Sequence, residues 1–117
     1  MELNVGTWLG PDAAEDRRVL VRTMQRHALE VRLAAESRRP RAESLAVDVD
    51  PGQISVPTLV VSGCRDMDQF RDIAQHLART IARARLETLE WAAHLPSLER
   101  PNEVNTLITR YLADCDT

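Results

Sequence analysis

Residues 56–66 read Val-Pro-Thr-Leu-Val-Val-Ser-Gly-Cys-Arg-Asp, and this stretch joins a strand pattern to the turn that follows it. The run over 58–62 is almost continuously apolar, which is typical of a strand covered on both faces in a parallel sheet. Pro57 stands at the entrance of this strand, where a missing N–H group is tolerated. The pattern therefore predicts an α/β fold in which this strand ends in an acidic loop at Asp66 and Asp68.

A helix, a second strand and another helix are predicted after this loop. Residues 69–83 carry apolar side chains at positions i, i+3, i+4, i+7 and i+11, which is the stripe of an amphipathic helix. Residues 85–90 indicate a weaker strand, and residues 101–113 indicate a helix with Pro101 in its first turn, where proline is favoured. We expect the two helices to bury Phe70, Ile73, Ala74, Leu77 and Ile81, and Val104, Leu107, Ile108, Tyr111 and Leu112, respectively.

One aspartate and one histidine follow the two predicted strands. Parallel strands joined by a helix end at the same edge of the sheet, where ligands usually bind in open α/β folds. Asp66 follows the first strand, and His94 follows the second behind the small pair Ala92-Ala93, which lets one loop pass close to another. We therefore expect Asp66 and His94 to meet in space.

The chemistry of such a pair is that of a general base and its orienting carboxylate. A histidine base must be kept in one tautomer, and a carboxylate on its other ring nitrogen does this. Asp68 directly precedes the predicted helix and suits its N-cap, so we favour Asp66 as the partner of His94. On this pattern alone, turn aspartates and a surface histidine are the simpler interpretation. His76 lies off the helical stripe and is predicted to be a surface residue.

The N-terminal part of the chain is predicted to be helical. Residues 16–37 have apolar positions on more than one face, so this helix is either buried on two sides or missing a neighbour. Asp12 and Glu15 have the spacing of a capping box at its start, and Pro40 ends it. Residues 41–53 are typical of a linker that closes in a turn.

Composition narrows the class of protein. At 117 residues, with 44% hydrophobic and 28% charged residues, the chain is one globular domain or less. A net charge of -3 predicts no nucleic-acid surface. No stretch reaches the roughly 18 apolar residues of a membrane span, and the polar residues 1–4 do not predict a signal peptide. All 15 basic residues are arginine, as in proteins of GC-rich bacteria, and Cys64 and Cys115 fit reduced cytoplasmic thiols rather than a metal site.

Two motifs of the chain resemble those of the α/β-hydrolase family. Residues 56–66 are similar to the family's strand-and-acid motif, P-x-L-hydrophobic-hydrophobic-x-G-x-x-D. Residues 92–104, Ala-Ala-His-Leu-Pro-Ser-Leu-Glu-Arg-Pro-Asn-Glu-Val, are similar to its histidine motif, G-H-x-x-x-x-E-x-P-x-x-hydrophobic. The spacing between the motifs also matches, and the resemblance covers residues 54–114. It implies that Asp66 is the acid and His94 the base of a catalytic triad.

Three further positions bear on this resemblance. Glu99 and Pro101 match structural positions of the family after the histidine. Ala93 stands where the family usually has glycine, and alanine is the mildest replacement for glycine. Cys64 lies next to the strand end, and a thiol paired with histidine can act as a nucleophile. We disfavour Cys64 in that role because it lacks the expected turn and stands two residues from the acid.

The nucleophile of the family is not found in this chain. It belongs to a G-x-S-x-G elbow, and no serine here lies between glycines at that spacing; the oxyanion-hole motif is also missing. In the family the nucleophile precedes the acid and the histidine. The resemblance therefore implies that residues 54–117 are the C-terminal strand-helix-strand-helix part of an α/β-hydrolase parallel sheet. Residues 1–53, a helical segment and linker, would be the remnant of a helical cap.

The resemblance implies a hydrolase for an ester, lactone or similar carbonyl substrate, with no cofactor. Such a small-molecule substrate is expected only if an N-terminal half completes the enzyme, because the chain alone lacks the nucleophile. The alternative is a non-catalytic truncated remnant or interaction module. In that case the chain would associate with itself or another chain through an exposed sheet edge.

Overall fold

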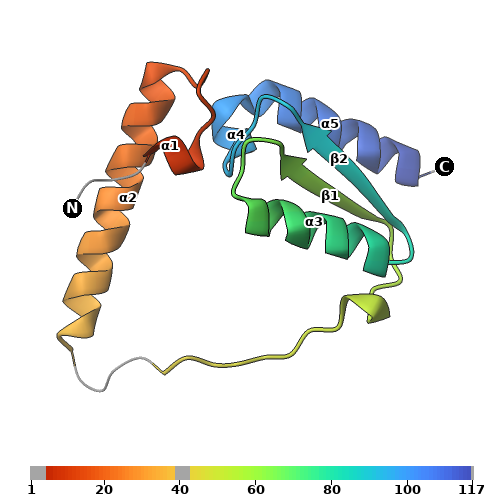
Figure 1. Ribbon diagram of the computed structural model, residues 1–117, viewed down its shortest axis with the longest axis horizontal. Coiled ribbons are helices and arrows are strands. Elements are labelled where there is room, and N and C mark those ends of the chain that lie inside the picture. Colours follow the sequence, from red (N-terminus) through yellow and green to blue (C-terminus); the bar gives the residue numbers. More distant parts are fainter. Residues whose placement is uncertain (1–4, 39–42, 117) are drawn as a thin grey trace.

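A parallel two-stranded sheet lies at the centre of the C-terminal part of the protein. The computed structural model describes residues 5–38 and 43–116. Strand β1, Thr58–Gly63, pairs in parallel with β2, Ala84–Leu89. Both strands were predicted from the sequence to within one residue. The described chain is thus a mixed α/β structure, as its apolar patterns indicated (Figure 1).

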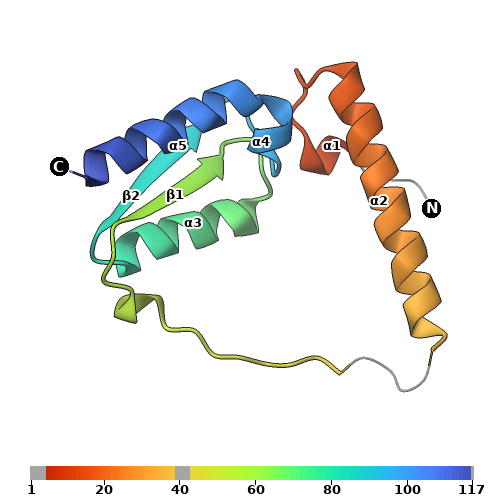
Figure 2. The same ribbon diagram turned by 180° about the vertical axis from the view of Figure 1, so that it is seen from behind.

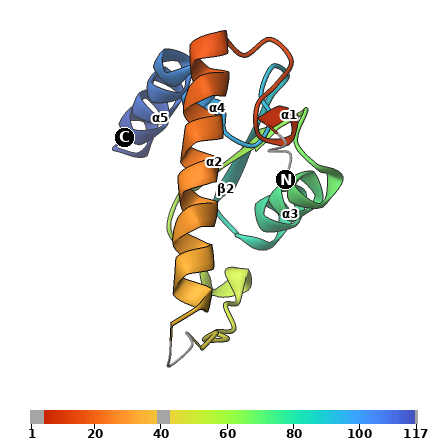
Figure 3. The ribbon, with the colours of Figure 1, turned by 90° about the vertical axis from the view of Figure 1, so that its left-hand side faces the viewer.

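Two helices cover the sheet from opposite sides. Helix α3, Asp68–Thr80, connects β1 to β2, and α5, Pro101–Cys115, follows β2. Seen from behind, the strands run between these two helices (Figure 2). A view turned by 90° also separates α3 from α5 across β2 (Figure 3). This layering explains the apolar run of β1, since a covered strand has no face that must be polar.

The register of the sheet fixes where the two loops begin. Thr58 is opposite Ala84 and Gly63 is opposite Leu89, so β1 and β2 end side by side. The backbone hydrogen bonds continue one step beyond the strands, because the Cys64 N–H donates to the Leu89 carbonyl oxygen at 2.9 Å. The acidic loop and the histidine loop therefore leave the sheet from the same edge.

Each of the two helices buries only part of its predicted stripe. On α3, Ala74 is buried but Ile73 is exposed. On α5, Val104 is buried, whereas the predicted burial of Ile108 and Leu112 was wrong because both are exposed. A sheet of two strands is too narrow to cover a whole apolar stripe, and no further layer lies over these positions in the described ranges.

The N-terminal segment contains a short helix and a long one. Helix α1, Val5–Trp8, was not predicted, and α2, Glu15–Glu36, lies within one residue of its predicted bounds. The predicted capping box of Asp12 and Glu15 was wrong, because the N-cap is Ala14 and no side chain caps the helix. Instead, the Arg18 guanidinium orders the preceding turn by donating to backbone carbonyl oxygens of Gly10, Pro11 and Ala13.

A small apolar core attaches this segment to the rest of the protein. Val5, Leu9 and Val21 are buried together. Leu95 and Leu98, which follow β2 in the chain, pack against them, as do Trp8 and Ala13. The C-terminal half of α2 lies apart from the sheet in Figure 1, and its Val31 and Leu33 side chains are exposed. The sequence predicted that this helix is either buried on two sides or missing a neighbour. The second description fits this half of the helix.

The segment between α2 and β1 has little regular structure. Residues 43–50 form no helix or strand, and a single 3-10 turn, η1, Pro51–Gln53, follows them. This agrees with a linker. The predicted helix stop at Pro40 and the polar residues 1–4 lie outside the described residues. Among the helices that are described, none has the length and apolarity needed to cross a membrane.

Candidate active site

Asp66 and His94 meet at the carboxyl edge of the sheet. His94 Nδ1 lies 2.9 Å from Asp66 Oδ2 and 3.2 Å from Asp66 Oδ1. The side chain of Asp66 is only 10% exposed and that of His94 is 25% exposed, so water competes weakly for this contact. An ionised carboxylate only accepts hydrogen bonds, so Nδ1 donates and Nε2 carries the basic lone pair. The juxtaposition expected from the sequence is therefore present.

The acidic loop fixes Asp66 through its own backbone. The Asp66 N–H donates to the Gly63 carbonyl oxygen at 3.2 Å, and Asp66 Oδ1 accepts from the Met67 N–H at 2.8 Å. The predicted capping role of Asp68 was wrong. Helix α3 begins one position earlier than such a cap requires, with Met67 as N-cap, and the Asp68 carboxylate pairs with the Arg71 guanidinium inside the first turn.

The histidine loop lies directly against the end of β1. A Cβ atom built on Gly63 would be 2.2 Å from the Ala93 carbonyl oxygen and 2.4 Å from that of Ala92. Both alanines are buried, and the Arg65 N–H donates to the Ala92 carbonyl oxygen at 2.9 Å. The prediction that small residues let this loop pass close to its neighbour is confirmed, and Gly63 provides the space on the other side.

Glu99 connects the histidine loop to the segment behind it. The short helix α4, Pro96–Glu99, follows His94 and was not predicted. Glu99 Oε1 accepts from the Ala93 N–H at 2.9 Å, one residue before the histidine. Glu99 Oε2 lies 2.8 Å from the position that a Cβ atom on Gly10 would take, so the N-terminal segment also packs closely here. Glu99 thereby positions the backbone from which His94 projects.

Two aromatic rings contact the imidazole of His94. The Trp8 ring meets it edge-on with a centroid distance of 4.9 Å, and the Phe70 ring lies tilted at 4.4 Å. The Trp8 carbonyl oxygen also accepts from the N–H groups of His94 at 3.1 Å and Leu95 at 3.0 Å. These contacts restrict the rotation of the imidazole. Sequence reasoning missed them, although the scarcity of aromatics made Trp8 and Phe70 conspicuous.

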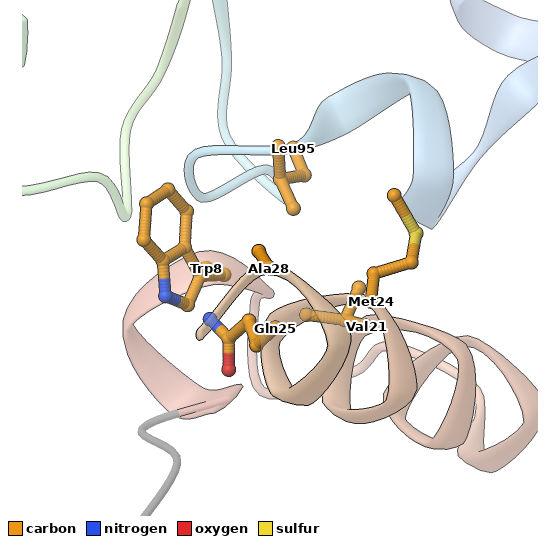
Figure 4. Close-up of a pocket in the computed structure, with 6 residues that line it drawn as sticks. All are labelled: Trp8, Val21, Met24, Gln25, Ala28 and Leu95. Carbon is orange, nitrogen blue, oxygen red and sulfur yellow. The ribbon is translucent and has the colours of Figure 1, made fainter. Parts of the chain in front are cut away.

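Two hollows lie near the pair. One of about 230 Å³ is bounded by β1 and α3 and reaches Asp66 and His94. The other, of about 290 Å³, lies between α2 and the loop after β2, where Trp8 and Leu95 form part of its wall (Figure 4). Binding pockets for whole small-molecule ligands begin at about 300 Å³, so each of these smaller hollows has room for part of such a ligand.

In the described part of the chain, no hydroxyl or thiol group forms a hydrogen bond with the His94 ring. The hydrogen bonds of the His94 ring go only to Asp66. Cys64 and Cys115 are free, exposed thiols. Across residues 5–38 and 43–116, no three His, Cys, Asp or Glu side chains gather into a metal-binding group. The site is thus an imidazole oriented by a carboxylate.

Comparisons of this chain with protein-family models, with curated proteins and with solved structures found no match. A function for the chain therefore has to be inferred from the geometry of its own residues. Asp66 and His94 stand 28 positions apart in the sequence, and the fold brings their side chains into contact. Their catalytic roles remain predictions.

Proposed function

We propose that this chain supplies the acid and base of a hydrolase of the α/β-hydrolase type, which acts on an ester, lactone or similar carbonyl substrate. The observation that carries the proposal is the 2.9 Å contact between His94 Nδ1 and Asp66 Oδ2 at the carboxyl ends of two parallel strands. The contact keeps one tautomer, with Nε2 as the base. Nε2 has no hydrogen-bond partner in the described ranges and is left for the reacting groups.

The proposed chemistry follows from this tautomer. A nucleophilic hydroxyl donates its proton to His94 Nε2 as its oxygen attacks the carbonyl carbon of the substrate. Asp66 stabilises the imidazolium that forms, and His94 then returns the proton to the leaving group. A water molecule then attacks the acyl group by the same steps, with His94 again taking the proton, and the carboxylic acid product is released. The edge-on ring of Trp8 and the tilted ring of Phe70 keep the imidazole in place through these transfers.

The nucleophile and the oxyanion hole would come from a segment outside this chain. Strand β1 pairs only with β2 in the described ranges, so its second edge has no strand beside it. A strand added in parallel there would end at the same edge as β1, within reach of His94. The 230 Å³ hollow lies between β1 and α3, next to the pair. We expect the chain alone to be inactive, since the oxyanion hole is often the largest catalytic contribution.

The free edge of β1 also favours a second function, that of an interaction module. Unpaired strand edges associate readily with other strands. Val56, just before β1, and Ile73 on α3 are exposed apolar residues. On this alternative the chain pairs with a second copy and the Asp66–His94 contact serves only stability. Sedimentation over a range of concentrations would detect such self-association.

The hydrolase proposal is tested by ester hydrolysis in two steps. The purified chain is first assayed with p-nitrophenyl acetate and butyrate, beside His94→Ala and the matched control His76→Ala, an exposed histidine on α3. No difference among the three is expected. The polypeptide encoded directly upstream in the same frame, which we expect to carry G-x-S-x-G, is then joined to the chain. Hydrolysis should appear and fall about 10³-fold or more in His94→Ala, but not in His76→Ala.

Three results would overturn the proposal. The first is an upstream sequence without a nucleophile elbow, which would leave the interaction module. The second is a joined protein that hydrolyses neither ester, and the third is activity in the joined protein that survives His94→Ala. Activity of the chain alone that His94→Ala abolishes would instead place the nucleophile within this chain, and Cys64→Ser would then test the exposed thiol beside the strand end.

A further inference from the structure

The hollow between α2 and the loop after β2 is lined almost entirely by apolar side chains. Figure 4 shows Trp8 from α1 and Leu95 from the loop facing side chains of α2 across the hollow. Gln25 is the one polar residue of the lining, and its Oε1 is buried without a hydrogen-bond partner in the described residues. The complete lining is Trp8, Val21, Met24, Gln25, Ala28 and Leu95.

Two residues that line this hollow, Trp8 and Leu95, are also neighbours of His94. Leu95 directly follows His94 in the chain, and the Trp8 ring packs edge-on against the imidazole at 4.9 Å. The Trp8 carbonyl oxygen accepts from both N–H groups of this dipeptide, at 3.1 and 3.0 Å. A ligand in the hollow therefore touches the same residues that position the base. His94 itself lines the neighbouring hollow between β1 and α3, and its ring contacts Trp8, which lines this one.

We infer that this hollow binds the apolar tail of the substrate, a conclusion that rests on the proposed function through the role of His94 as base. The substrate class is then an ester or related acyl compound whose carbonyl lies beside His94 and whose tail lies between Trp8, Ala28 and Leu95. A cavity of about 150 Å³ accommodates benzene. A hollow of about 290 Å³ therefore has room for a tail of about six to twelve carbon atoms.

The inference gives α2 a specific task. The first half of α2 is anchored through Val21, which is buried with Val5 and Leu9. The next turns contribute Met24, which is 52% exposed, and Ala28, whose small side chain leaves the hollow open. An apolar tail would cover the side chains that α2 now exposes on this face.

The test measures binding by the full chain, so that it does not require a nucleophile. Methyl butanoate, methyl hexanoate and methyl octanoate are titrated while NMR follows the indole N–H of Trp8 and the imidazole of His94. A Trp91→Phe variant distinguishes the two indole signals. We expect the Trp8 signal to shift and the dissociation constant to fall about fourfold for each added methylene, as burial of apolar surface predicts. The His94 signals should move with it.

Matched substitutions on α2 locate the binding site. Ala28→Phe fills the hollow and should weaken methyl octanoate binding about tenfold or more, since it displaces at least two methylenes. Ala34→Phe makes the same change at an exposed position of α2 outside the lining and should leave binding unchanged. Met24→Trp narrows the hollow from an exposed position and should also weaken binding, even if Ala28→Phe impairs folding.

Each contrary result has a definite meaning. Affinity that does not depend on chain length, or equal binding by Ala28→Phe and Ala34→Phe in folded protein, would overturn the inference. A Trp8 shift without any change at His94 would overturn the position of the carbonyl beside the pair. Failure of the joined protein to hydrolyse esters would remove the proposed function. It would leave the binding result intact, because the titration does not depend on catalysis. The titration is therefore repeated in His94→Ala, where the tail should still bind.

Discussion

Gly63 and Ala93 lie so close together that the end of β1 has no room for a side chain. A Cβ atom on Gly63 would approach the Ala93 carbonyl oxygen to 2.2 Å. This approach lets the histidine loop fold over the strand end and brings His94 to Asp66. The contact is between backbone atoms, so neither side can relieve a clash by a change of rotamer. The position of the Asp66–His94 pair thus depends on a residue that takes no part in their contact.

Gly63→Ala is expected to destabilise the protein and to displace His94. Overpacking of a close contact costs about 1–3 kcal/mol, and a clash with backbone belongs to the upper part of this range. Urea unfolding measures the loss, and the NMR signal of the His94 Nδ1 proton reports the displacement. Gly52→Ala is the matched control. There the nearest atom is the Asp50 side-chain oxygen at 3.1 Å, so we expect a change within about 1 kcal/mol. Equal effects at both glycines would contradict the close-approach explanation.

Glu99→Ala is expected to lower stability through the backbone of the histidine loop. The Ala93 N–H, on a residue that is 2% exposed, donates to Glu99 Oε1 at 2.9 Å and would be left without a partner. A buried donor without a partner costs about 1–3 kcal/mol. Glu99→Gln keeps an acceptor oxygen and should cost less than Glu99→Ala in urea unfolding. If the two variants were equally unstable, the hydrogen bond to Ala93 would not be the cause.

Asp66→Asn is expected to remove the preference of His94 for one tautomer while leaving the fold intact. An amide can donate as well as accept, so the Nδ1-protonated form is no longer selected. Nitrogen-15 chemical shifts of the imidazole distinguish the two tautomers directly. The parent protein should show a protonated Nδ1, and Asp66→Asn should show a mixture or the reverse. Asp68→Asn, which changes the carboxylate paired with Arg71 on α3, should leave the tautomer unchanged.

Tyr111, the single tyrosine of the chain, is expected to titrate above its usual range. Burial raises the pKa of Tyr111 above its ordinary value of 10.0, and the hydrogen bond and charge of Cys115 raise it further, while Arg83 and Arg85 lower it. The folded protein therefore keeps this proton when the unfolded chain loses it. The resulting stability is fully present below a pH of about 10 and is lost as the pH rises through the folded pKa.

Ultraviolet absorbance of the tyrosinate, followed against pH, measures this midpoint. In Cys115→Ser the midpoint should move down towards the ordinary value, because the thiolate charge is removed. It should stay above that value, since burial is the largest of the causes. A parent midpoint at or below the value found in urea would contradict the prediction.

Local sequence patterns predicted the secondary structure well. The apolar run of β1, the weaker pattern of β2 and the stripes of α3 and α5 all correspond to elements of the structure. Periodicity reports which side of an element can be buried, and each pattern lies within one short stretch of chain. The contact between Asp66 and His94 was predictable from the order of these elements, because parallel strands joined by a helix end at the same edge of the sheet. The α/β fold class and the candidate pair were therefore contained in the sequence.

Only the tertiary structure decided what surrounds that pair. Three features do not follow from any local pattern: the packing of Trp8 and Phe70 against His94, the hydrogen bond that Glu99 accepts from the histidine loop, and the exposure of Ile108. Periodicity marks the face that an element can bury, but whether a neighbour covers that face depends on segments far away in the chain. In the same way, the sequence determined that a carboxylate and an imidazole share one sheet edge. The fold decided that a tryptophan from the N-terminal segment completes their surroundings.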